Sequence, residues 1–114
     1  MLLINEEQMK ALDAVMNERF IDKMLEHLRD VFSEEIKEKT DEEMRTVILD
    51  GMMRASEYHI TEEQAMALFI DLTVGMGKDF ERQKGNEWIL SILEKEDLRG
   101  QEKMDLLYTR LSQD

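Results

Sequence analysis

The stretch that decides the fold is Thr61-Glu-Glu-Gln-Ala-Met-Ala-Leu-Phe-Ile-Asp-Leu-Thr-Val-Gly-Met-Gly77, which is apolar on nearly every side of a helix. No lysine or arginine occurs between Arg54 and Lys78. A helix that is apolar all round has to be covered by other helices. Thr61 begins a segment with the pattern of a capping box, which predicts that the helix starts there. The stretch therefore predicts the buried central helix, residues 61–77, of a small all-α domain.

The remainder of the chain also favours helices, because proline is absent and apolar residues recur every three or four positions. Two further start signals, Asn5-Glu-Glu-Gln8 and Thr40-Asp-Glu-Glu43, place a short hydrogen-bond acceptor just before acids. We expect residues 1–114 to form a single all-α domain, a bundle of about five helices around the central one. The other helices are expected over about residues 6–32, 41–58 and 86–95, and after Gly100.

One long loop is expected after the central helix, over residues 78–85. Loops carry binding residues more often than packed faces do, and aromatic side chains anchor many protein interfaces. We therefore predict that segment 78–88 contributes to a partner-binding surface through Asp79, Phe80 and Trp88. The alternative is that both aromatic side chains pack on the core.

Asp71 is the most unusual residue of the central helix, because it interrupts an apolar run on an element that is expected to be buried. A carboxylate in that position has to be hydrogen-bonded, paired with a cation, or turned toward a partner protein. We expect an arginine or a backbone amide of a neighbouring helix to hold it. If it is not held inside the fold, Asp71 becomes a candidate partner-binding residue.

The charge of the chain limits its partners. It has 27 acidic residues against 15 basic ones, a formal net charge of −12. Such a field repels phosphate backbones and anionic membranes and attracts basic proteins. We therefore expect a partner protein with a basic surface, and neither direct nucleic-acid nor membrane binding. The oligomeric state is left open.

The sequence also bears on the compartment. Cysteine is absent, which excludes disulfides and thiolate chemistry and fits a reducing compartment. The beginning of the sequence lacks the basic residues and the apolar length of a signal peptide. No uncharged apolar run approaches the roughly 20 residues that span a bilayer. We expect a cytoplasmic protein.

Nothing in the sequence predicts an enzyme. With 27 acids, any chosen pair of carboxyl groups is uninformative as a catalytic pair. His27 and Asp30 lie one helical turn apart, but such pairs are common on solvated helix faces, and neither histidine belongs to a Glu-x-x-His motif. No phosphate-binding glycine motif is present. We expect no catalytic residue, no metal and no cofactor.

Several short segments resemble a group of small bacterial proteins associated with type VI secretion and polymorphic-toxin gene neighbourhoods. The matching features are Arg19-Phe20, Met24-Leu-Glu-His-Leu-Arg29, Tyr58-His-Ile-Thr61, Phe69-Ile-Asp-Leu72, Gly77-Lys-Asp-Phe80, Trp88-Ile-Leu90, Lys103-Met104 and Leu107-Tyr108. The resemblance implies an accessory role as an immunity protein, an adaptor or a chaperone that engages a toxin or a secreted effector. The alternative is an acidic regulatory protein or nucleic-acid mimic that occupies a DNA-binding partner.

Overall fold

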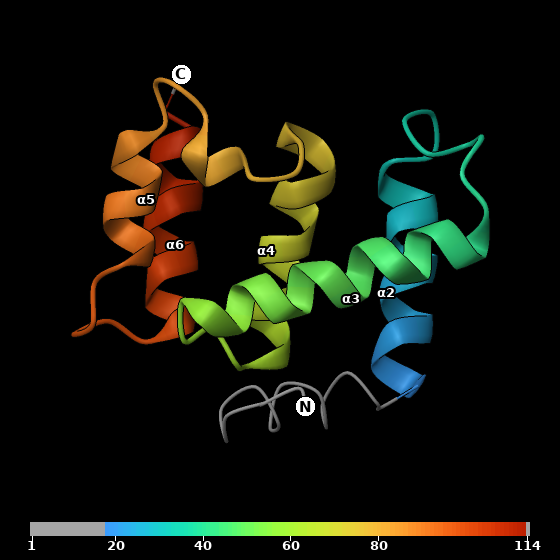
Figure 1. Cartoon of the computed structure of the whole chain (residues 1–114), viewed down its shortest axis with the longest axis horizontal. Helices are drawn as coiled ribbons and strands as arrows, with labels where there is room; N and C mark the ends of the chain where they lie inside the picture. The colour runs from blue at the N-terminus through green and yellow to red at the C-terminus, as the bar shows by residue number, and fades with distance from the viewer. Residues whose placement is uncertain (1–17, 114) are drawn as a thin grey trace, which may run out of the picture.

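A computed structural model describes residues 18–113 of the chain. This part contains five α-helices and one short 3₁₀ helix and no strand (Figure 1), so the prediction of an all-α bundle is confirmed. The predicted helix start at Asn5 and the expected helix over residues 6–17 lie outside the described residues. The elements are α2 (Glu18–Val31), α3 (Asp41–Glu57), α4 (Glu63–Met76), η1 (Phe80–Arg82), α5 (Glu87–Leu93) and α6 (Gly100–Leu111).

Helix α4 occupies the middle of the bundle, as its sequence predicts. It packs against α2, α3, η1 and α6. Figure 1 shows α4 between α2 on one side and the paired α5 and α6 on the other, with α3 running across. Burial is incomplete, because one side of α4 faces an open region beside α2. Its buried side chains are Ala65, Met66, Phe69, Ile70, Leu72 and Thr73.

Helix α3 begins at the predicted capping box and ends in a tight turn. The backbone N–H of Glu43 donates to the Thr40 hydroxyl at 3.0 Å, and the Glu43 carboxylate accepts from the Thr40 N–H at 2.8 Å. At the other end His59 has a φ of 61°, and the Ile60 N–H donates to the Ala55 carbonyl. This is the Schellman pattern, which stops the helix and turns the chain toward α4.

The glycine inside α3 marks a close approach of α3 to α4. A Cβ atom added to Gly51 would lie 2.9 Å from Cγ1 of Ile70 on α4. Glycine is unfavourable within a helix by about 1 kcal/mol relative to alanine. Its presence here lets α3 pack directly on the central helix.

The predicted cap of the central helix at Thr61 is wrong. Helix α4 has Glu62 at its N-cap position, and no side chain caps it. The reason is that Ile60 is fully buried and lies against Gly100 of α6, so packing rather than the Thr61 hydroxyl places the start of the helix. Asn86 stands at the N-cap of α5, but its side-chain amide donates to the Phe80 carbonyl instead, and α5 ends at Leu93, earlier than expected.

Candidate functional site

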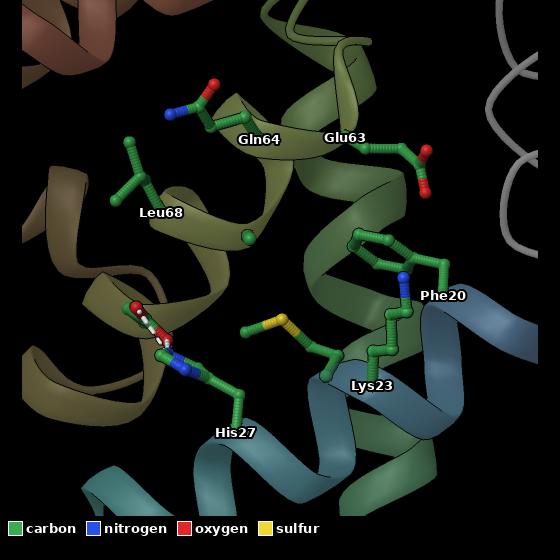
Figure 2. A pocket seen from close by; sticks show the side chains of 9 residues that line it. Phe20, Lys23, His27, Glu63, Gln64 and Leu68 are labelled. Atoms are coloured by element: carbon green, nitrogen blue, oxygen red, sulfur yellow. Dashed lines mark hydrogen bonds and ion pairs between the residues drawn. The ribbon is translucent and has the colours of Figure 1, made fainter.

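An open hollow of about 430 Å³ lies between α2 and α4, and most of the surface that lines it is apolar (Figure 2). We refer to it as the α2–α4 hollow. Helical spacing explains its composition, because residues three or four apart share one face of each helix. Its volume falls in the range of small-molecule and side-chain pockets. The described residues that line it are Phe20, Lys23, Met24, His27, Glu63, Gln64, Ala67, Leu68 and Asp71.

Asp71 is held by His27 at one end of the α2–α4 hollow. The Nε2 atom of His27 lies 2.9 Å and 3.0 Å from the two carboxylate oxygens (dashed lines in Figure 2). The Asp71 side chain is 18% exposed and that of His27 is 42% exposed. The prediction that Asp71 has a partner inside the fold is confirmed. The partner is a histidine of α2, however, and not an arginine or a backbone amide.

His27 compensates the burial of Asp71 only in part. Burial raises the pKa of the Asp71 carboxyl above its ordinary value of 3.8. The hydrogen bond and the charge of His27 act in the opposite direction without cancelling the effect of burial. Burial raises the pKa of Tyr108 on α6 to about 12, and the charge of Asp71 makes a smaller contribution in the same direction. The interactions with His27 therefore do not fully offset the cost of burying the ionised carboxylate of Asp71.

The other charged groups at the α2–α4 hollow are mostly acidic. Lys23 and Glu63 line it and lie near Phe20, away from His27 in Figure 2. Glu26 and Asp30 lie beside His27 in the adjoining depression on α2, which Lys23 also lines. One lysine thus stands against four carboxylates when Asp71 is included. The potential at this end of the hollow favours a cation.

A second polar cluster is buried in the core and joins α3 to η1. The guanidinium of Arg54 and the hydroxyl of Tyr58 both donate to the carboxylate of Glu81, the hydroxyl at 2.7 Å. Arg54 is 8% exposed and Glu81 is 2% exposed. Burial alone would raise the pKa of Glu81, but these two hydrogen bonds, a backbone hydrogen bond and the charge of Arg54 together outweigh it, and the pKa lies below its ordinary value. Both carboxylate oxygens of Glu81 accept hydrogen bonds, whereas the Nη1 atom of Arg54 is buried without a partner among the described residues. A buried cluster that ties two elements together in this way is structural.

The aromatic residues of segment 78–88 take packing roles. Phe80 is fully buried, with its ring centroid 5.3 Å from that of Phe69, so it is not the exposed anchor that the sequence predicted. The reason is that η1 folds back onto α4 and delivers the ring to the core. Trp88 is half-buried, and the Arg110 guanidinium stacks 4.3 Å from its ring centroid. The packing alternative therefore describes Phe80, and the binding role of Trp88 stays a prediction.

Asp79 is exposed and pairs with the Arg54 side chain at 3.4 Å. It has a φ of 60°, and the turn there brings η1 against α3. The four predicted binding residues thus do not form one site. Asp71 lies at the α2–α4 hollow, whereas Asp79, Phe80 and Trp88 lie around η1 and α5.

Sequence reasoning missed three residues of structural weight. Glu81 stands among other charged residues in a segment predicted as a loop, and nothing in the pattern distinguishes it. Lys103 is 1% exposed and donates from Nζ to the Tyr58 carbonyl at 2.7 Å, with burial lowering the pKa of its amine. His27 was considered only as a metal ligand. No signal in the sequence pairs it with Asp71, which lies 44 positions away.

Within residues 18–113, no group of three or more histidine, cysteine, aspartate or glutamate side chains could hold a metal ion. Over the same range, no helix is both long enough and apolar enough to cross a membrane. Comparisons with protein-family models, with curated proteins and with solved structures found no match to this chain. The resemblance to secretion-associated proteins stays a prediction.

Proposed function

We propose that this protein acts by binding a partner protein that carries a basic surface, and that the α2–α4 hollow is the docking site. One observation carries the proposal: the hollow is mostly apolar, yet the carboxylate of Asp71 lies at one end of it, with both oxygens on a single nitrogen atom of His27. Binding pockets are usually lined by apolar side chains with a few placed polar groups that fix the orientation of the ligand. The neighbouring carboxylates would reject anionic partners.

The charge of the whole chain supports the same function. A net charge of −12 on 114 residues steers basic proteins toward the surface and accelerates their encounter. Steering alone provides little selectivity, because exposed charges are screened by salt. The α2–α4 hollow would add the apolar contacts and the fixed charge that select one partner.

A binding role fits the chemistry of the site better than catalysis does. His27 and Asp71 form a base and acid pair, but the described residues that line the hollow include no serine, threonine or cysteine that His27 could activate. The pair also stands at an open surface and not in a closed cleft. We infer that the protein is not an enzyme.

The resemblance implies a partner among toxins or secreted effectors, and we propose on that basis that this protein is an immunity protein, an adaptor or a chaperone. The alternative is an acidic regulatory protein or nucleic-acid mimic, because an acidic surface can occupy a DNA-binding partner. The identity of the partner separates the two. A toxin or effector supports the first role, and a DNA-binding protein supports the second.

Affinity capture with two matched variants tests the proposal. Gln64→Arg places a positive charge in the α2–α4 hollow, where Gln64 is exposed. Ser91→Arg places the same charge at an exposed position of α5, a helix that does not pack against α2. The partner is captured at low salt, identified, purified and titrated against each variant. Circular dichroism verifies that both variants keep the fold.

The expected result is one basic partner whose affinity falls at least about tenfold with Gln64→Arg and changes little with Ser91→Arg. Equal losses with both variants would indicate that only overall charge matters, and would remove the hollow from the interface. If no protein is recovered at low salt, where attraction between opposite charges is strongest, the binding function itself is wrong.

A further inference from the structure

We infer that the α2–α4 hollow accepts an arginine side chain of the partner, and that its guanidinium replaces His27 on the carboxylate of Asp71. This inference rests on the proposed function, because it names the group that the partner inserts. More generally, it assigns to the hollow a ligand class, a planar cation carried on an apolar stem.

His27 does not satisfy the full hydrogen-bonding capacity of the Asp71 carboxylate. Both of its oxygens lie within 3.0 Å of the same nitrogen atom of His27, so two acceptors share one donor. A guanidinium or amidinium group presents two parallel N–H donors, which match the two oxygens of a carboxylate. Such a bidentate, charge-assisted pair is stronger than a single shared hydrogen bond.

The walls of the hollow suit an apolar stem. Phe20 and Met24 of α2 face Ala67 and Leu68 of α4 across it. The methylene groups of an arginine side chain pack well on such a surface while its charged end reaches a polar group. Among the described lining residues the only lysine is Lys23, which lies near Phe20 in Figure 2. Lys23 also borders the depression beside His27, where the carboxylates of Glu26 and Asp30 outnumber it.

The position of His27 allows its ring to rotate away from Asp71. Its side chain is 42% exposed, and it also borders the outer depression with Glu26 and Asp30 on α2. Rotation of the ring into solvent would keep it near these two carboxylates while freeing Asp71. His27 therefore occupies the carboxylate in the absence of a partner and competes with an incoming cation. Removal of this ring should strengthen cation binding.

Benzamidine is a suitable probe, because it joins an amidinium to an apolar ring, and neutral benzamide of the same shape serves as its control. The full chain is labelled with ¹⁵N and titrated with each compound while amide shifts are recorded. Benzamidine should shift amides around His27 and Asp71 in a saturable manner. Benzamide should bind at least about tenfold more weakly. Equal binding of the two compounds, or benzamidine shifts elsewhere only, would overturn the inference.

Two variants locate the contact. Asp71→Asn keeps the size of the side chain and should weaken benzamidine binding at least about tenfold. His27→Ala should tighten it several-fold, because the competing donor is gone. Unchanged binding in Asp71→Asn, with the fold verified by its amide spectrum, would contradict the role of the carboxylate. Weaker binding in His27→Ala would contradict the exchange.

The benzamidine experiment and the partner-capture experiment can fail independently of each other. If Gln64→Arg releases a basic partner but benzamidine does not bind, the ligand class is wrong and the docking site stands. If benzamidine binds at Asp71 but no partner protein is found, the cation site stands and the protein-binding function is wrong.

Discussion

The Nε2 atom of His27 lies 2.9 Å and 3.0 Å from the two carboxylate oxygens of Asp71, and this pair joins α2 to α4 at the edge of an open apolar hollow. The two helices meet there through a single shared donor. The pair is only partly buried, with 42% of the histidine side chain exposed. It is therefore a weak structural link at a position that suits recognition.

The first prediction concerns the pKa of Asp71. In the folded protein it should lie above 3.8, because burial disfavours the charged form. In His27→Ala it should rise further, because both effects of His27 lower it. A pH titration of the side-chain carboxyl carbon by NMR measures both values. A lower pKa in His27→Ala would show that the histidine does not support the carboxylate.

The second prediction concerns the stability that Asp71 provides. A raised pKa means that the folded state binds the proton more tightly than the unfolded state does. The stabilising contribution is therefore greatest below the unfolded pKa near 3.8 and is lost as the pH rises through the folded pKa. At pH 7 Asp71→Asn should change the free energy of unfolding by less than about 1 kcal/mol. Urea denaturation of both proteins measures the difference. A loss of about 3 kcal/mol or more would identify a buried structural ion pair instead.

The third prediction concerns the buried cluster around Glu81. Glu81→Ala leaves the Arg54 guanidinium without its buried partner, and should lower the free energy of unfolding by about 3–5 kcal/mol. Glu57→Ala, which removes an exposed acid of α3, should change it by less than about 0.5 kcal/mol. Denaturant melts at neutral pH compare the two variants. Similar losses in both would mean that Glu81 is solvated.

Glu81 should also contribute to acid unfolding. Its pKa is lower in the folded state than the ordinary value of 4.5, so the unfolded state takes up its proton first. The stability it provides is present above pH 4.5 and is lost as the pH falls through the folded pKa. Glu81→Gln should therefore lose less stability than the wild type between pH 5 and about pH 3. Melting curves across that range show whether the two slopes differ, and equal slopes would contradict the prediction.

The fourth prediction compares two helical glycines. Gly51→Ala brings a methyl group to 2.9 Å from the branched side chain of Ile70, and should destabilise the protein by about 1–2 kcal/mol. Gly75→Ala meets only the Phe32 ring at 3.4 Å, so the higher helix propensity of alanine should prevail, with a gain of up to about 1 kcal/mol. Thermal melts of the two variants should move in opposite directions. A stabilised Gly51→Ala would contradict the close approach of α3 to α4.

Local signals in the sequence predicted much of the fold. The capping box at Thr40 and the apolar run of α4 depend on neighbouring residues, and both are present in the structure. The predicted box at Thr61 failed because the buried Ile60, held against α6, determines where α4 begins. Such a constraint comes from a distant helix and leaves no local pattern.

The candidate site was less predictable than the fold. Asp71 was recognisable as a polar residue in an apolar helix, and the expectation that it has a partner was correct. Its pairing with His27 depends on how α2 and α4 are rotated about their axes, and the sequence does not specify that rotation. The same holds for Glu81, whose burial follows from the turn at Asp79 that folds η1 onto α3 and α4.

The location of the partner on this protein is the central claim, and hydrogen exchange of the purified complex tests it most directly. We predict slower amide exchange in residues 20–27 of α2 and 64–71 of α4 when the partner is bound. The same experiment on Gln64→Arg, at a concentration that saturates the wild type, should show little of this protection. Protection confined to segment 78–88, or to any surface away from the α2–α4 hollow, would contradict the account.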